Sequence, residues 1–172
     1  RDPGNTAPIS EQADTSLAVR GAAWALVRYA ADNYSGDNPR AFLRALATGP
    51  GVGLANLTSK LAGGTSLEMV LSGWHVANFA DNLNIPNLPQ RLTYRSWHIR
   101  DVVGSAVGGS YPLAITTISG DGTHANDARS TGGAVYYRFS VAGGSFTALQ
   151  LTNGAGTTAG FSGGRLVILR AQ

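Results

Sequence analysis

The organisation of this chain is set first by the run VRGAAWALVRYAAD at residues 19–32. Its apolar residues recur every three to four positions, which predicts an amphipathic helix. A polar residue at 14–16 can cap the free N–H groups at its start, and the pattern continues to about Asn33. Because the run is rich in alanine and glycine, we expect close packing against neighbouring helices. We expect one packing face, made by Leu17, Gly21, Trp24 and Ala31 and widened by Leu26, Val27 and Ala30.

Cap and stop signals predict three further helices. One begins at Asn38-Pro39, an N-cap followed by a proline at the first helical position, and ends before Gly49-Pro50. The next covers about residues 52–61 and ends before a glycine pair. The last follows Thr65-Ser66-Leu67-Glu68, which has the pattern of a capping box with Thr65 as the cap. This helix is expected to end near residues 81–82.

The composition changes near residue 103, from helical patterns to short β-branched and aromatic runs separated by glycine pairs. We therefore predict an α+β fold, with a helical unit of about four helices over residues 1–103 and a Gly-rich β module over 104–172. The module is expected to form a small antiparallel sheet or sandwich. Its candidate strands are residues 111–119, 134–141, 146–152 and 165–170.

Between these two units the pattern is less regular. Prolines and asparagines over residues 83–90 predict an irregular surface connection. After it, apolar residues alternate with polar ones, which predicts one or two short strands. The alternating residues are Leu92, Tyr94, Trp97 and Ile99.

The amino-acid composition of the chain excludes several classes of protein. The chain has 172 residues, of which 13% are charged, and a formal net charge of +3. Its basic residues are scattered rather than clustered, which argues against nucleic-acid binding. It has no cysteine, so a thiolate nucleophile and a disulfide framework are excluded. No apolar run approaches the roughly 18 residues of a membrane span, and we expect a mature form or a fragment of an exported protein.

Several motifs occur in an order that resembles a known family. They are Arg20-Gly21-Ala22-Ala23-Trp24, the helix start Pro39-Arg40-Ala41-Phe42-Leu43, the segment Tyr94-x-x-Trp97-x-x-Arg100, and the run Gly132 to Arg138. Together they resemble the C-terminal half of exported bacterial metallopeptidase-related proteins of the hyicolysin (gluzincin) type. The resemblance implies a helical unit followed by a Gly-rich β module.

The chemistry of that family does not carry over to these residues. Its zinc is held by a His-Glu-x-x-His helix and a third carboxylate ligand, and an adjacent glutamate activates water. This chain has only three histidines, His75, His98 and His124, and only two glutamates, Glu11 and Glu68. None of them forms the motif. We therefore assign no catalytic, metal-binding or cofactor-binding residue.

Three isolated features each have a functional and a structural interpretation. His75 and His98 are either ligands or proton carriers, or ordinary residues at the edge of a packed face. The segment Asp121 to Asp127 either binds a cation through its oxygen atoms or forms a hairpin turn. Gly49 to Gly53 resembles a phosphate loop but lacks the following lysine, so a helix break is favoured.

Aromatic and arginine side chains supply the best candidates for an interaction surface, because both are enriched in protein interfaces. The candidates are Tyr94, Trp97, Arg100, Tyr111, Tyr136 and Tyr137. The competing interpretation is that about half of these aromatic rings fill the core. We predict a noncatalytic, exported binding or scaffolding subunit without a cofactor, periplasmic or extracellular, with a protein partner such as the periplasmic face of a membrane complex. The alternative is the C-terminal portion of a zinc peptidase whose catalytic helix lies upstream.

Overall fold

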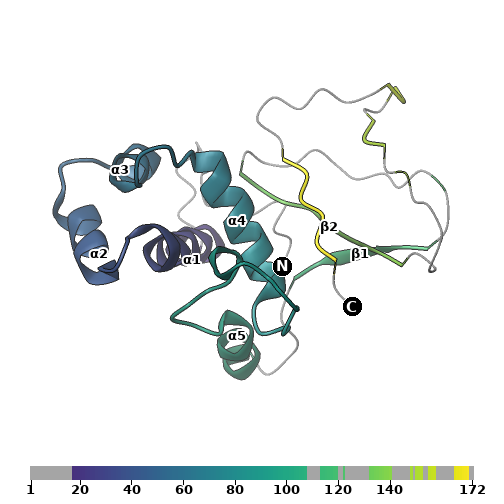
Figure 1. Cartoon of the computed structure of the whole chain (residues 1–172), viewed down its shortest axis with the longest axis horizontal. Coiled ribbons are helices and arrows are strands. Elements are labelled where there is room, and N and C mark those ends of the chain that lie inside the picture. The colour runs from purple at the N-terminus through teal and green to yellow at the C-terminus, as the bar shows by residue number, and fades with distance from the viewer. Residues whose placement is uncertain are drawn as a thin grey trace.

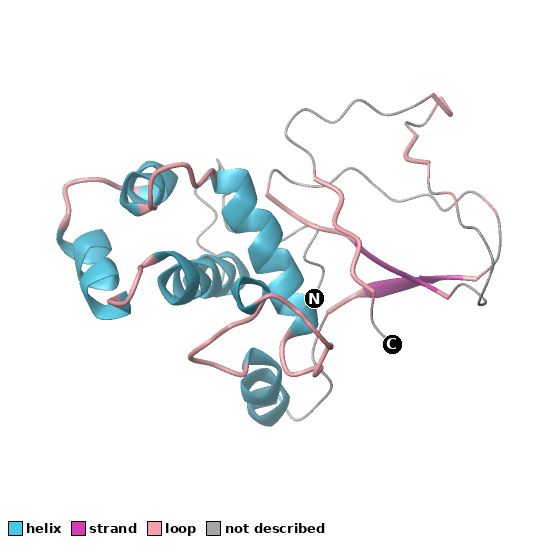
Figure 2. Cartoon of the chain, viewed as in Figure 1, coloured by secondary structure: helices cyan, strands magenta, loops and turns pink. Residues whose placement is uncertain are grey.

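A computed structural model describes residues 17–107, 113–119, 122, 132–140, 148, 150–152, 155–157 and 165–170. Within them the protein has the predicted α+β architecture, with helices gathered on one side and a small sheet on the other (Figures 1 and 2). The helices are α1 (Leu17–Tyr34), α2 (Pro39–Thr48), α3 (Gly53–Lys60), α4 (Leu67–Ala80) and α5 (Ile99–Val107), with a 3₁₀ turn η1 (Gln90–Leu92). The strands are β1 (Ile115–Ile118) and β2 (Tyr136–Phe139). None of the described helices is both long and apolar enough to cross a bilayer.

Helix α1 is confirmed, but it buries only part of the face that was expected to pack. Its buried residues include Leu26, Tyr29 and Ala30, which join the main hydrophobic core. Ala31 of the expected face is also fully buried, whereas Leu17 is 79% exposed and Trp24 is 48% exposed. The reason is that small residues line both sides of this helix, and the large Leu26 and Tyr29 decide which side is buried.

A close approach between α1 and α4 sets the geometry of the core. Tyr29 is fully buried, and its hydroxyl lies directly against Gly73 of α4. A methyl group at Gly73 would collide with that hydroxyl. The hydroxyl cannot easily move aside, because it donates a hydrogen bond to the carbonyl of Arg91 at 2.6 Å. Gly73 is therefore the residue that lets these two helices meet.

Caps define the remaining helices of the bundle. The predicted cap of α2 is confirmed, since Asn38 Oδ1 accepts the N–H of Ala41 at 2.9 Å. The predicted cap of α4 was wrong by one residue. Ser66, not Thr65, accepts the N–H of Met69 at 3.2 Å. The Ser66 hydroxyl also lowers the pKa of the exposed Glu68 carboxylate, which suits the positive end of a helix dipole.

The connection after α4 is irregular, as predicted, and its asparagines have a specific reason. Asn82, Asn84 and Asn87 all adopt positive φ, at 55°, 51° and 58°. Among residues other than glycine, asparagine is one of the few that tolerate the left-handed, positive-φ region. These residues let the chain turn back several times within a short distance.

The strands predicted over residues 92–99 were wrong. This segment contains the end of η1, an extended stretch and the start of α5. The alternation of apolar residues arises because the segment lies across the ends of α1 and α4 and buries one side against them. Helix α5 also runs across the division expected between residues 103 and 104, so the change in composition there is not an element boundary.

Among the described residues the sheet has two strands, and they run parallel rather than antiparallel as expected. β1 and β2 pair in parallel, with Ile115 opposite Tyr136 and Ile118 opposite Phe139. A hairpin produces antiparallel neighbours, whereas a parallel pair needs a crossover of a dozen or more residues. The connection over residues 119–135 is long enough for that crossover. Residues 165–170 form neither helix nor strand, and residues 146, 147 and 149 of the candidate strand 146–152 lie outside the described residues.

Candidate functional site

Residues 91–100 form a continuous strap that lies across the C-terminal ends of α1 and α4. Two side chains of α1 bind its backbone carbonyls: the Tyr29 hydroxyl donates to Arg91 O, and Asn33 Nδ2 donates to Thr93 O at 3.0 Å. Burial raises the pKa of Tyr29 far above its ordinary value, so the hydroxyl keeps the proton that it donates. The strap is thus fixed along its first half by α1.

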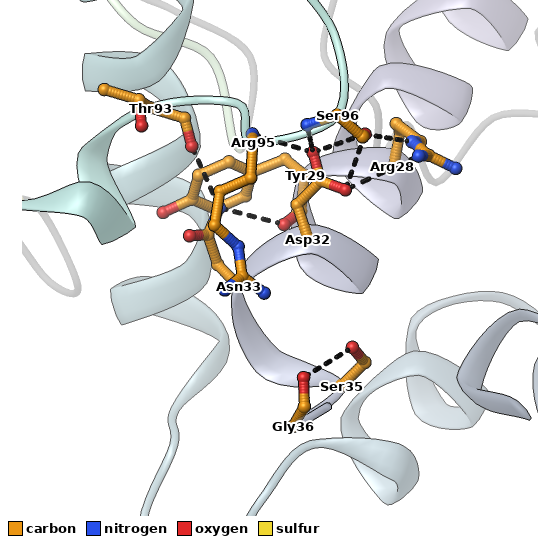
Figure 3. Close-up of polar contacts among 9 residues, drawn as sticks. All are labelled: Arg28, Tyr29, Asp32, Asn33, Ser35, Gly36, Thr93, Arg95 and Ser96. Atoms are coloured by element: carbon orange, nitrogen blue, oxygen red, sulfur yellow. Dashed lines mark hydrogen bonds and ion pairs between the residues drawn. The ribbon is translucent and has the colours of Figure 1, made fainter. Parts of the chain in front are cut away.

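Asp32 fixes the middle of the strap (Figure 3). It is 2% exposed, and its Oδ2 atom accepts the N–H groups of Arg95 and Ser96 at 3.0 and 3.1 Å. The Ser96 hydroxyl donates to the same carboxylate at 2.7 Å. Arg28 lies on the other side, with Nη2 3.6 Å from Oδ1 and Nε donating to the Ser96 hydroxyl oxygen at 2.8 Å. The hydrogen bonds and the cation together compensate the burial of this charge.

Tyr94 belongs to the core and not to the predicted interaction surface. It is 5% exposed. Its hydroxyl accepts a hydrogen bond from Trp74 Nε1 at 2.8 Å and donates one to Asn78 Oδ1 at 2.7 Å. This chain of hydrogen bonds ties the strap to the inside of α4. The first residue of the Tyr-x-x-Trp-x-x-Arg motif is therefore an anchor.

Arg100, the last residue of that motif, caps α4. Its guanidinium donates to the carbonyls of Asp81 at 2.9 Å and Phe79 at 2.6 Å, where a cation is favoured by the helix dipole. The backbone N–H group of Arg100 donates to Asp81 Oδ2 at 2.8 Å. Asp81 is 1% exposed, and burial raises the pKa of its carboxyl, opposed by that backbone hydrogen bond. Arg100 has a structural task that explains its position.

Trp97, the middle residue of the motif, is partly buried and lies at the edge of the core. Its ring packs edge-on against Trp24 of α1, with ring centroids 4.7 Å apart and an interplanar angle of 62°. Trp24 is 48% exposed and Trp97 is partly buried. Arg20 and Arg28 lie one helical turn on either side of Trp24, on the same ridge of α1. We call these four residues the Trp24–Trp97 face.

Of the three tyrosines predicted for the interaction surface in the β part, the structure describes two. Tyr136 is partly buried and contacts α4, because its hydroxyl donates to the carbonyl of His75 at 2.9 Å and its ring stacks with Phe79. Tyr137, the next residue, is 36% exposed and points to the other side of β2. Tyr111 lies outside the described residues. The structure therefore does not join the six predicted residues into one surface.

The remaining sequence candidates separate in the same way. His75 is partly buried at the contact between α4 and residues 132–136, whereas His98 is exposed. Gly49 to Gly53 links α2 to α3, and Asn56 closes this turn by donating to Leu46 O at 2.9 Å. The Asp121–Asp127 segment lies outside the described residues apart from Gly122. No group of three or more metal-ligating side chains occurs within the part of the chain that the structure describes.

Sequence reasoning missed Trp24 and the two buried aspartates as determinants of this region. A physical signal for the aspartates was present. Asp32 lies in the last turn of α1 and Asp81 at the C-cap of α4, where the helix dipole disfavours a negative charge. Acidic residues at such positions need a specific partner elsewhere in the fold, and the strap supplies it.

Comparisons with known proteins add no family to this description. No protein-family model, curated protein or solved structure gives a significant match to the chain. The relation to the gluzincin type of metallopeptidase therefore stays a prediction from the sequence motifs.

Proposed function

We propose that this protein is a noncatalytic binding or scaffolding subunit that holds a protein partner through the Trp24–Trp97 face. One observation carries the proposal: a half-exposed tryptophan packed edge-on against a second one, on a support held by buried hydrogen bonds. Tryptophan and arginine are the residues most enriched among those that dominate binding energy. Large apolar rings left at a surface mark sites of interaction.

The rigidity of the support favours this use of the rings. Trp97 follows Ser96, which Asp32 holds through its N–H and hydroxyl, and Trp24 sits in the middle of α1. Because neither backbone has to be ordered on binding, little conformational entropy is lost when a partner covers the rings. The two side chains also restrict each other's rotamers through their contact.

The charges beside the rings indicate the chemistry of the partner. Arg20 is exposed and makes no ion pair within the described residues. Arg28 is held in place by Ser96 and by Asp32, so part of its positive charge is already compensated. An arginine ridge next to tryptophans favours a protein surface that offers carboxylates and an apolar or aromatic side chain. We therefore expect an acidic partner segment.

The location is part of the same proposal. We propose that the protein is exported and acts in the periplasm or outside the cell, with the periplasmic face of a membrane complex as the docking place. Its support is the resemblance to exported proteins, the absence of cysteine and the low content of charged residues. Fractionation of the native cells, with the protein followed by antibody, tests the location independently of the binding face.

The binding face is tested by affinity purification of the tagged protein from native envelope extract, followed by titration of the purified partner. We expect Trp24→Ala and Trp97→Ala each to weaken binding by about tenfold or more, because residues of this kind cost at least about 1.4 kcal/mol when truncated. Arg20→Glu should weaken binding at low salt and less at high salt. Val52→Ala is the matched control, since Val52 is 83% exposed and lies at the start of α3.

Two results would refute the proposal. One is a partner that binds both tryptophan variants as tightly as it binds the wild type. The other is equal loss of binding in Val52→Ala, which would show that no particular face is used. Circular dichroism of each variant confirms that the helices are retained.

A further inference from the structure

His75 joins the helical part of the molecule to the β part. It lies in the middle of α4, and its Nε2 atom is 2.9 Å from the carbonyl oxygen of Gly132. The Tyr136 hydroxyl donates to the backbone carbonyl of His75 at 2.9 Å and lies 3.4 Å from His75 Nδ1. One turn further along α4, Phe79 stacks with the Tyr136 ring, with centroids 6.4 Å apart and planes 20° apart. We call these four residues the α4 junction.

The hydrogen bonds of the junction fit a neutral imidazole. The Gly132 carbonyl can only accept, so Nε2 carries a proton and donates it. The Tyr136 proton is directed to the His75 carbonyl, and Nδ1 then needs no proton of its own. Burial lowers the pKa of His75, and the Gly132 carbonyl opposes this effect to a smaller extent. A second proton on Nδ1 would place a full positive charge in this partly buried contact.

No described group near His75 is placed to neutralise that charge. On α4 its neighbours at three and four residues are Leu71, Ser72, Asn78 and Phe79, which are uncharged. On the facing segment the titratable group in contact is the Tyr136 hydroxyl, and Gly132 offers a neutral carbonyl. The nearest charged residue along the same face of β2 is Arg138, which is exposed.

We propose that His75 is a pH-sensitive latch, which holds residues 132–139 against α4 while it is neutral and releases them when it is protonated. The released segment exposes Phe79 and the side of α4 that the junction covers. This local opening leaves the strap and the main core in place, because the hydrogen bonds of His75 go to Gly132 and Tyr136; the ring of the core residue Trp74 lies beside His75, with centroids 4.6 Å apart, and is held by its own bond to Tyr94. The latch goes beyond the proposed binding function and does not depend on it.

The direction of the pH effect follows from linkage. The pKa of His75 in the closed state is below its ordinary value of about 6.5, so the released state binds the proton more tightly. The closed state is therefore fully favoured above about pH 6.5 and loses stability as the pH falls below it. Between the two pKa values the ratio of released to closed molecules should rise by up to about tenfold for each pH unit.

The direct test follows the full-length wild-type protein by NMR from about pH 7.5 to about pH 4.5. We expect the His75 ring signals to titrate below about pH 6.5, and the amide signals of residues 132–139 to change with the same midpoint. The amides of α1 and the strap should not share that transition. If His75 titrates at or above its ordinary pKa, or if the amides of 132–139 keep their shifts throughout, the latch is refuted.

A pair of variants assigns the transition to one residue. His75→Gln keeps a side-chain N–H that can donate to Gly132 O but cannot be protonated in this range, so the amide transition of residues 132–139 should disappear. His98→Gln is the matched control, because His98 is exposed and lies outside the junction, and the transition should remain. A transition that persists in His75→Gln refutes the latch. Should this variant not fold, the wild-type titration decides the question alone.

Discussion

Asp32 accepts both the backbone N–H and the hydroxyl of Ser96, a residue 64 positions further along the chain. A single buried carboxylate on α1 thereby fixes the backbone on which Trp97 is presented. The stability of the strap and the presentation of the Trp24–Trp97 face consequently depend on the same contact.

Replacing this carboxylate by an amide tests that dependence. In Asp32→Asn the charge is lost, and an NH₂ group must face donors that the carboxylate accepted. We expect the free energy of unfolding to fall by about 2–3 kcal/mol, the size of hydrogen bonds to a charged group. Urea unfolding measures the change. Asp37→Asn, at an exposed position, should stay within about 0.5 kcal/mol of the wild type.

The close approach of α1 and α4 predicts a sharp contrast between two glycine variants. Gly73→Ala should destabilise the protein by about 1–3 kcal/mol, because the added methyl collides with the Tyr29 hydroxyl. Gly21→Ala should stabilise it by up to about 1 kcal/mol, since Gly21 is an exposed residue of α1 with open space around it.

A double-mutant cycle identifies the colliding group. Removing the hydroxyl in Tyr29→Phe should reduce the cost of Gly73→Ala, so that the two changes are not additive. Additive effects would show that the methyl at residue 73 is opposed by something other than the Tyr29 hydroxyl.

The two buried aspartates should respond differently to the same substitution. The Asp81 carboxylate accepts a single hydrogen bond from the described residues, from Arg100 N, and burial raises the pKa of this carboxyl, which disfavours its charged form. Near pH 7 we expect Asp81→Asn to cost less than about 1 kcal/mol, well below the cost of Asp32→Asn. The Arg100 guanidinium keeps its carbonyl partners in this variant.

The pH dependence of that comparison has a definite sign. The pKa of Asp81 is higher in the folded state than its ordinary value of 3.8. Its ionisation therefore disfavours folding, and this effect appears as the pH rises through the folded pKa. The stability of Asp81→Asn relative to the wild type should increase over that rise, as measured by urea unfolding at a series of pH values. A flat difference would contradict the assignment.

Replacing each of two tryptophans by alanine should change the free energy of unfolding by different amounts. Trp74 is 4% exposed and donates to Tyr94, so Trp74→Ala should cost about 3–5 kcal/mol. Trp97→Ala should cost no more than about 1.5 kcal/mol, the size of an aromatic pair contact. Thermal and urea unfolding check both values. If Trp97→Ala were as damaging as Trp74→Ala, the Trp24–Trp97 pair would have to be regarded as part of the core.

The first four helices were predictable because their signals are local. Asn38 caps α2 within the same turn, and the apolar spacing of α4 repeats along a single element. The strap was not predictable in this way. Its apolar residues alternate with polar ones as they do in a strand. Its conformation, however, depends on contacts with Tyr29, Asp32 and Asp81, which lie far away in the sequence.

The candidate site was only partly predictable for a related reason. Trp97 was identified as an interaction residue, and the structure shows it partly buried, packed against Trp24 and against the core. Tyr94 and Arg100 were grouped with it by motif, although their hydroxyl and guanidinium groups are used inside the fold. Trp24 was assigned to a packing face, because the small residues of α1 do not reveal which side is buried.

The strap also has a consequence for the order in which the protein folds. The strap can dock only after the ends of α1 and α4 have formed, and its contacts with α1 close loops of 60 residues or more. Docking of the strap is therefore expected after the rate-limiting barrier, since distant contacts are slow to form. Variants that weaken it should accelerate unfolding while leaving the folding rate nearly unchanged. The lifetime of the native state, more than the speed of reaching it, is thus set by residues 91–100.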